Sequence, residues 1–290
     1  MKPPVILLQE RDFGQKINAT FDFIVQNFKP LILAVLYIAG PPALIGGFFM
    51  GSYQSGILGL IKQSRETQLD GLMSTFTSVG LLALFLGIAG IAATLAVNAY
   101  MLEYEDGNRS ITPEMVWNRM KGYILRSIGY SIAMFFLAMI GFVFFVIPGL
   151  YLAIALSLMY MVMMRENLDL GDTFRRCFYL IKDKWWSTFG LIFIMGIVSG
   201  IIGYIFQIPT MIVTLSSVLQ IGDGMNEIWS TVGGVIATVG SVLVRTLVLV
   251  AIAFQYYNLV ERREGAGILG AIDNIGKTDT PRTDLREEEF

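Results

Sequence analysis

Arg245 is the residue whose type and position most favour chemistry in this chain. It lies near the middle of a long apolar stretch, and the chain's six apolar stretches contain no Asp or Glu to pair with it. A guanidinium at the centre of a bilayer costs about 2.5–3.5 kcal/mol on insertion scales. Water in a cavity, a lipid phosphate or a ring of backbone carbonyls can offset that cost. One hypothesis is an anion or lipid-headgroup site, and the alternative is a structural arginine that snorkels outward or caps carbonyls near Pro209.

Polar residues in the neighbouring apolar stretch are the candidate partners for that site. They are Gln207, Thr214, Ser216 and Ser217.

A second group of candidate residues combines cations with two tryptophans. These residues are Arg175, Arg176, Lys182, Lys184, Trp185 and Trp186. One interpretation is a surface that binds anionic lipid or docks a cytoplasmic partner. The other is an ordinary interfacial helix, whose cations follow the positive-inside rule and whose tryptophans sit in the aromatic belt.

The usual catalytic residues are missing from the apolar stretches. The chain has no histidine, and its single cysteine is Cys177. Without His, Asp, Glu or Cys in those stretches, the common proton-transfer groups are absent. We therefore predict no enzyme, no cofactor and no metal site. The net charge of -2 argues against a nucleic-acid partner, which normally meets a basic surface.

The elements that must position these residues are membrane-spanning helices. Hydrophobic residues make up 54% of the 290, and charged residues only 15%, against about 25% in soluble domains. About 20 apolar residues span the hydrocarbon core as a helix. Six spans are predicted, in three hairpins of an all-α fold: Pro30–Met50, Val79–Met101, Ser127–Val146, Leu150–Met164, Trp185–Gln207 and Thr231–Tyr257.

The distribution of cations predicts the orientation of these spans. Segments on one side hold four, four, five and five of the 21 Lys and Arg residues, whereas only Lys62 and Arg65 fall on the other. Cytoplasmic loops carry the excess of positive charge. We predict a multi-pass protein of the bacterial inner membrane with both termini in the cytoplasm.

An amphipathic segment precedes each odd-numbered span, with apolar residues at steps of three and four. Such helices are expected at the cytoplasmic membrane surface. Their apolar stripes are Ile17, Phe21, Ile24 and Phe28, then Val116, Met120 and Tyr123, then Leu170, Phe174, Cys177, Phe178 and Ile181.

Proline and glycine residues predict how the spans are connected. Ile147-Pro148-Gly149 predicts a tight turn between the third and fourth spans. Gly51–Ser78 is expected to lie on the outer surface. Pro209 is expected to break the fifth span, which leaves Pro209–Ile221 as a short re-entrant or surface helix. The polar residues 261–290 predict a flexible cytoplasmic tail, either solvated or binding a partner.

Closely spaced glycines predict helix contacts. Gly47 and Gly51 form one small face, and Gly196, Gly200 and Gly203 form another. Small faces let helices approach closely. We expect packing within one bundle, and the alternative is a homo-oligomer.

Several segments resemble a large bacterial family, the membrane domain of glycerophosphoryl diester phosphodiesterases. The resemblance covers roughly residues 11–265. It is carried by Phe145-Val-Ile-Pro-Gly-Leu-Tyr-Leu, by Arg165-Glu-Asn-Leu-Asp-Leu-Gly-Asp, by Lys184-Trp-Trp-Ser-Thr-Phe-Gly and by Phe254-Gln-Tyr-Tyr-Asn-Leu-Val-Glu. It implies a six-span membrane domain and adds no chemistry, because the residues after Glu264 are too few for the soluble catalytic domain.

Two functions are therefore expected. The first is a non-enzymatic accessory or membrane-organising subunit with membrane lipids and a protein as partners. The alternative is a transporter or a lipid- or anion-handling protein with a cavity around Arg245. A polar cavity near the membrane midplane favours the second, and a filled core favours the first.

Overall fold

The computed structural model describes residues 3–62, 68–144, 146–219, 227–265 and 269, and helices are the regular structure found there. This confirms the all-α prediction. In chain order the elements are α1 (Phe13–Gln26), α2 (Phe28–Lys62), α3 (Gln68–Glu105), α4 (Pro113–Met120), η2 (Lys121–Tyr123), α5 (Ile124–Phe144), α6 (Val146–Ala155), η3 (Leu156–Leu158), α7 (Met159–Glu166), α8 (Leu170–Ile181), α9 (Trp185–Leu219) and α10 (Glu227–Glu264).

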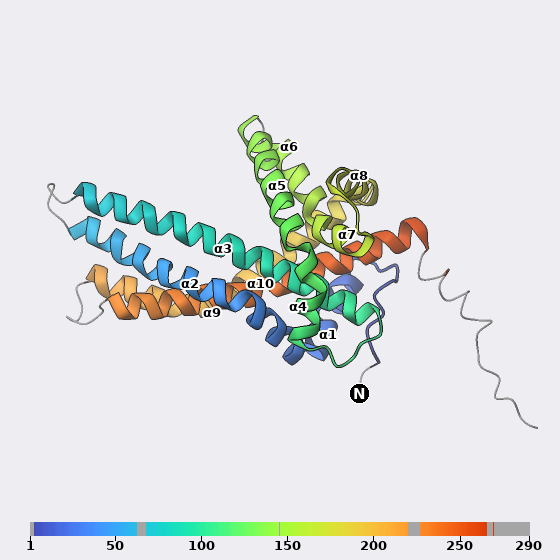
Figure 1. The fold of residues 1–290 in the computed structure, drawn as a ribbon, viewed down its shortest axis with the longest axis horizontal. Helices are drawn as coiled ribbons and strands as arrows, with labels where there is room; N and C mark the ends of the chain where they lie inside the picture. Colours follow the sequence, from blue (N-terminus) through green and yellow to red (C-terminus); the bar gives the residue numbers. More distant parts are fainter. Residues whose placement is uncertain (1–2, 63–67, 145, 220–226, 266–268, 270–290) are drawn as a thin grey trace, which may run out of the picture.

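Six helical stretches of the described chain are long and apolar enough to cross a membrane, as predicted. They are Phe28–Ile57, Gly71–Glu105, Pro113–Gly141, Val146–Glu166, Trp185–Leu219 and Ile228–Glu264. The chain is therefore a polytopic membrane protein. Figure 1 shows α2, α3, α9 and α10 side by side in one long bundle, while the α5–α6 hairpin rises from its flank at a steep angle.

The four long helices extend beyond the predicted spans. Each has 35 or 38 residues, which is more than about 50 Å at 1.5 Å per residue, against about 30 Å of hydrocarbon. Within Gly51–Ser78, α2 continues to Lys62 and α3 begins at Gln68, and residues 63–67 lie outside the described residues. The outer-surface location expected for this segment stays a prediction. Packing against a neighbour keeps these less apolar turns helical.

The predicted break at Pro209 is wrong. α9 passes through Pro209 to Leu219 without interruption, so 209–219 is neither re-entrant nor a separate surface helix, and 220–221 lie outside the described residues. Transmembrane helices tolerate proline where other groups satisfy the freed backbone. Proline at position 209 leaves the Ile205 carbonyl without its helical donor, and α9 packs on α10 at this point, where a Cβ on Gly233 would lie 3.5 Å from the Pro209 carbonyl carbon. Two further prolines, Pro41 and Pro42, lie inside α2.

The predicted turn of the second hairpin needs a smaller correction. α6 begins at Val146, so Pro148 and Gly149 lie in its first turn and not in the connection. The first turn of a helix tolerates proline because its N–H has no intrahelical acceptor there. Gly149 instead lets α5 and α6 pack closely, because a Cβ added to Gly141 of α5 would lie 2.9 Å from the Gly149 Cα.

The three predicted amphipathic helices are confirmed as α1, α4 and α8. Asp12, Thr112 and Asp169 cap their N-termini, each by accepting from a backbone N–H. The predicted face of α1 is only partly correct. Phe23 and Ile24 are buried, but Phe28 is 59% exposed and begins α2. α1 packs against α2, α9 and α10, which displaces its buried face from the predicted stripe.

Glycines on the facing sides of α2 and α10 let these two helices pack closely at the centre of the bundle. A Cβ on Gly47 would lie 2.5 Å from the Val235 Cα, and one on Gly51 would lie 2.4 Å from the Thr231 Cα. A Cβ on Gly234 would meet the Gly47 carbonyl oxygen at 2.5 Å. This face therefore packs within one bundle, as expected for small residues.

Candidate anion site in the groove between α9 and α10

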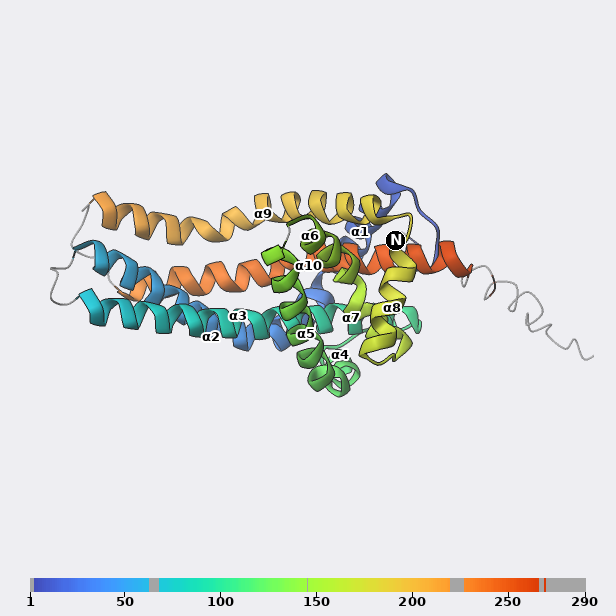
Figure 2. The same cartoon turned by 90° about the horizontal axis from the view of Figure 1, so that it is seen from above.

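Arg245 lies near the middle of α10, on a face that neighbouring helices leave exposed. Figure 2 shows α10 running between α9 and α3, with the α5–α6 hairpin in front of it. The Arg245 guanidinium lies beside Gly90 of α3, where an added Cβ would be 3.6 Å from Nη1. In the part of the chain that the structure describes, this guanidinium has neither a hydrogen bond nor an ion pair, and it caps no carbonyl near Pro209.

Residues from α9 and α10 form a groove of about 430 Å³ around Arg245. Its polar lining includes Arg245 and Ser241 from α10 and Ser199 and Gln207 from α9. Its remaining lining residues are Gly196, Gly200, Gly203, Tyr204, Val244 and Val248. An amphipathic ligand would therefore meet polar groups at the groove's centre and lipid-facing apolar side chains beside it.

Three glycines of α9 keep this groove open. A Cβ added to Gly196, Gly200 or Gly203 would have no atom within 4 Å, leaving aside the helix's own nearby backbone. We expected these glycines to bring a second helix close, as Gly47 and Gly51 do. In the described structure, no helix packs onto this face. The glycines instead provide space next to a charged side chain.

Two donors of the groove suit an anion. The Arg245 guanidinium offers five N–H groups and no acceptor. The amide nitrogen of Gln207 has no acceptor among the described residues, while its oxygen accepts from the Thr210 hydroxyl at 3.3 Å. The Ser199 and Ser241 hydroxyls already donate to the carbonyls of Val244 and Ala237, so the free donors are those of Arg245 and Gln207. Phosphate and carboxylate oxygens are the preferred acceptors for such donors.

A second hollow of about 610 Å³ lies further along α9, toward Leu219. Thr210 and Thr214 of α9 and Gln54 of α2 supply its polar lining. The Gln54 amide donates to the Thr214 hydroxyl at 3.3 Å, and its buried amide oxygen has no partner among the described groups.

The structure therefore separates the residues that the sequence grouped together. Arg245 and Gln207 share one groove, and Thr214 lies in the adjacent hollow. Ser216 and Ser217 are not among the lining residues of either space.

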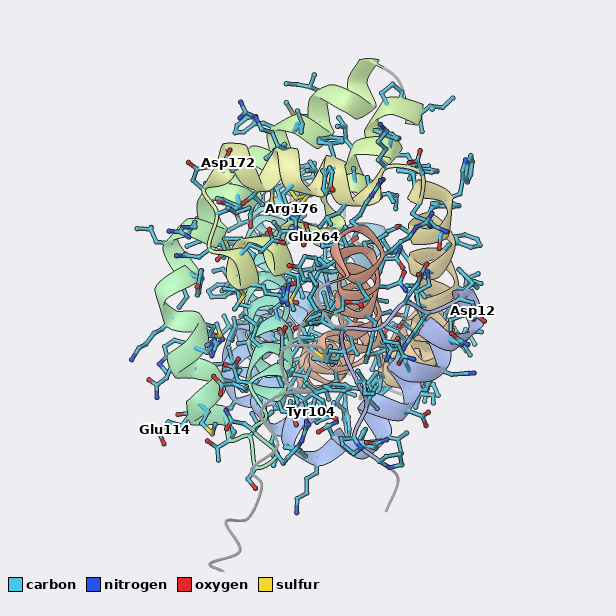
Figure 3. All side chains as sticks on the ribbon, turned by 90° about the vertical axis from the view of Figure 1, so that its right-hand side faces the viewer. Asp12, Tyr104, Glu114, Asp172, Arg176 and Glu264 are labelled. Carbon is cyan, nitrogen blue, oxygen red and sulfur yellow. The ribbon has the colours of Figure 1, made fainter. Side chains whose placement is uncertain are left out.

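The basic segment near residue 180 divides into exposed and paired cations. Arg175 is 88% exposed, and Lys182 is also exposed. Arg176 is only 18% exposed, because it pairs with Glu166 at 2.7 Å and with Glu264. Figure 3 shows Arg176 of α8 next to Glu264 at the end of α10. Although burial lowers it, hydrogen bonds to Glu264 and Glu166 hold the pKa of Arg176 above its ordinary value.

The rest of this segment lies where α8 leads into α9. Lys184 is half-buried, and Trp186 is 77% exposed. Trp185 stacks on Tyr151 and Phe189, with ring centroids 5.7 and 5.5 Å apart. The Trp185 indole also donates to the Tyr151 carbonyl. Trp186 is thus the tryptophan best placed for the lipid interface.

The sequence patterns did not predict a network of ion pairs that lies where α10 ends. Arg165 of α7 pairs with Glu105 of α3, which also accepts from the Tyr257 hydroxyl at 2.7 Å. Tyr256 donates to Glu166 at 2.7 Å, and Glu166 pairs with Arg176. The signal in the sequence that could have indicated this network is the pair of adjacent tyrosines, Tyr256 and Tyr257, before the charged end of α10. This network ties the second hairpin and α8 to the long bundle.

No protein-family model, curated protein or solved structure matches this chain. The resemblance to the phosphodiesterase membrane domain therefore stays a prediction. Fold and site together define the class: a polytopic all-α membrane protein with an open groove around a central arginine.

Proposed function

We propose that this protein is a non-enzymatic membrane protein that binds a phosphate-bearing anion at Arg245. One observation carries the proposal: an exposed guanidinium at mid-length of a spanning helix, unpaired within the described structure, on the wall of an open groove. A cation at that depth is costly unless an anion or water solvates it. The shared ligand chemistry is a phosphate group, from a phospholipid headgroup or from a soluble anion.

The shape and lining of the groove support this function over an accessory role. A filled bundle would bury Gly196, Gly200 and Gly203 against another helix, as it buries Gly47 and Gly51. The accessory hypothesis stays a prediction, to be tested by co-purification of a partner.

Binding is tested with purified full-length protein in detergent by native mass spectrometry. Phosphatidylglycerol and phosphatidylcholine are added in turn, with inorganic phosphate as competitor. We expect Arg245→Gln to weaken lipid binding by about 1.5–3 kcal/mol, the value of a hydrogen bond to a charged group. Arg245→Lys should retain part of the affinity, because a lysine still binds phosphate as a point charge.

Arg175→Gln is the matched control, because it removes an exposed cation on α8 and leaves the groove intact. Competition by inorganic phosphate would assign the site to a soluble anion, and lipid binding unaffected by phosphate would assign it to a headgroup. Equal lipid binding by the wild type and Arg245→Gln, together with weaker binding by Arg175→Gln, would refute the proposal in favour of the basic surface of α8.

A further inference from the structure

Polar side chains continue from the Arg245 groove along α9 toward Leu219. The Thr210 hydroxyl bridges to the Gln207 amide oxygen at 3.3 Å, and the Thr214 hydroxyl donates to the Thr210 carbonyl at 2.8 Å. Gln54 of α2 then donates to Thr214 at 3.3 Å. These contacts form a polar ladder along α9, from Gln207 in the Arg245 groove to Thr210 and Thr214 in the second hollow, with Thr210 buried against Gly233 of α10.

The ladder is long enough to reach from mid-depth to the membrane surface. From Ser199 to Thr214, α9 rises about 22 Å at 1.5 Å per residue. Half of a hydrocarbon core is only about 15 Å thick. A headgroup that enters beside Gln54 would therefore meet polar partners on its way to Arg245.

The second hairpin also carries polar groups. The phenol oxygen of Tyr160 on α7 lies 2.6 Å from the Ser131 hydroxyl of α5. α7 then leads to Glu166, in the network at the end of the bundle that holds α1.

Apolar side chains accompany the ladder on the outside of α9. Ile201, Ile205 and Met211 are 65%, 64% and 59% exposed. Acyl chains can stay against these residues while a polar headgroup occupies the groove. The open glycine face supplies the necessary width.

We infer that this groove carries phospholipid headgroups between the two membrane surfaces, so that the protein equilibrates lipids between leaflets without an energy source. This inference rests on the proposed function and deepens it by naming the ligand and its movement. Translocation of a charged headgroup is slow because the hydrocarbon core offers it no polar partners. The ladder and Arg245 would lower that barrier by replacing water at successive depths.

The test uses full-length protein in vesicles of phosphatidylcholine and phosphatidylglycerol with a trace of lipid bearing a headgroup fluorophore. Dithionite added outside bleaches only the outer leaflet of protein-free vesicles. With wild-type protein we expect the inner-leaflet fluorescence to be lost as well. Arg245→Gln and Gln207→Leu should each slow that loss about tenfold or more, a change worth about 1.4 kcal/mol per tenfold.

Gly200→Leu and Gly80→Leu form a matched pair. Both glycines have open space around an added Cβ, but only Gly200 lines the groove. Gly200→Leu should abolish the loss of inner-leaflet fluorescence, whereas Gly80→Leu should preserve it. Each variant is first required to give a monodisperse protein with wild-type helix content.

The outcomes separate this inference from the proposed function. Wild-type protein that binds lipid through Arg245 but leaves the inner leaflet fluorescent refutes translocation and preserves binding. Translocation unaffected by Arg245→Gln, Gln207→Leu and Gly200→Leu refutes the groove as its path. A wild-type dimer that Gly200→Leu converts to monomer would show that a second copy covers the groove, and would also overturn the inference.

Discussion

Arg165 and Glu105 form a two-point ion pair across 60 positions of the chain. Arg165 Nη2 lies 2.7 Å from Glu105 Oε1 and Nε lies 3.1 Å from Oε2, and the two side chains are only 21% and 22% exposed. Bidentate pairs of this kind combine charge with fixed geometry. The pair fastens α7 to α3 and so fixes the base of the hairpin that stands beside the Arg245 groove.

Removing the carboxylate of this pair should destabilise the protein. We expect Glu105→Gln to lower the free energy of unfolding by about 2–3 kcal/mol, because Arg165 is left partly buried without a counter-charge. Tyr257→Phe is the matched control, since it removes one hydrogen bond to the same carboxylate and should cost about 1 kcal/mol. Thermal unfolding in detergent measures both, and equal effects would contradict a dominant ion pair.

Close packing of α2 on α10 predicts a strong effect at Gly51. An alanine Cβ there would lie 2.4 Å from the Thr231 Cα, and backbone cannot move aside easily. We expect Gly51→Ala to cost about 1–3 kcal/mol, as overpacking does elsewhere. Gly80→Ala has free space and should change stability by less than about 0.5 kcal/mol. Similar unfolding temperatures for the two variants would contradict the helix contact.

Glycine shows how far the sequence could predict this structure. Hydrophobic length and helical periodicity revealed six spans and three amphipathic helices, because these signals depend on local sequence. Gly51 and Gly200 carry the same local signal, yet one packs against α10 and the other faces an open groove. Only the tertiary arrangement decides which small face is covered.

Proline and the charged residues show the same limit. Proline often ends a helix, but α9 continues through Pro209 while packed against α10. Arg175 and Arg176 are adjacent in sequence, yet only Arg176 reaches Glu166 and Glu264. Arg245 was detectable because an intramembrane charge is rare in any fold, whereas its partner residues required the structure.

Buried Lys16 predicts a specific dependence of stability on pH. Its amine donates to Ser187 at 2.8 Å and to Gln255 at 2.9 Å, and the residue is 3% exposed. Burial lowers the pKa of Lys16; Asp12 opposes this shift and Arg262 adds to it. The unfolded chain then binds more protons than the folded one between the lowered pKa and the ordinary lysine pKa. Stability must therefore rise with pH across that window.

Comparison with Lys16→Met isolates this contribution. As pH rises from neutral to about 10, close to the ordinary lysine pKa, the wild type should gain stability relative to the variant. Unfolding temperatures at several pH values measure the difference. Parallel curves would show that the folded protein holds the Lys16 proton as strongly as the unfolded chain does.

Cys177 should resist thiol reagents while the protein is folded. It is fully buried on α8, and burial raises the pKa of its thiol to about 12, with Glu166 adding to the shift and Arg176 opposing it. Because the thiolate is the reactive form, alkylation at neutral pH should require unfolding. Arg175→Cys in a Cys177→Ser background provides an exposed control on the same helix. Equal rates of maleimide labelling at the two positions would contradict the burial of α8 against the bundle.

The distribution of cations predicts an orientation in the membrane that the same reagent can test. Single cysteines at Lys62 and Arg175, each in the Cys177→Ser background, lie at opposite ends of the long bundle. The positive-inside rule predicts that the Arg175 end lies in the cytoplasm, because basic segments resist translocation. A membrane-impermeant maleimide added to intact spheroplasts should therefore label Lys62→Cys and leave Arg175→Cys unlabelled until lysis. Labelling of Arg175→Cys alone would invert the orientation, and labelling of both before lysis would mean that the long helices do not cross the membrane.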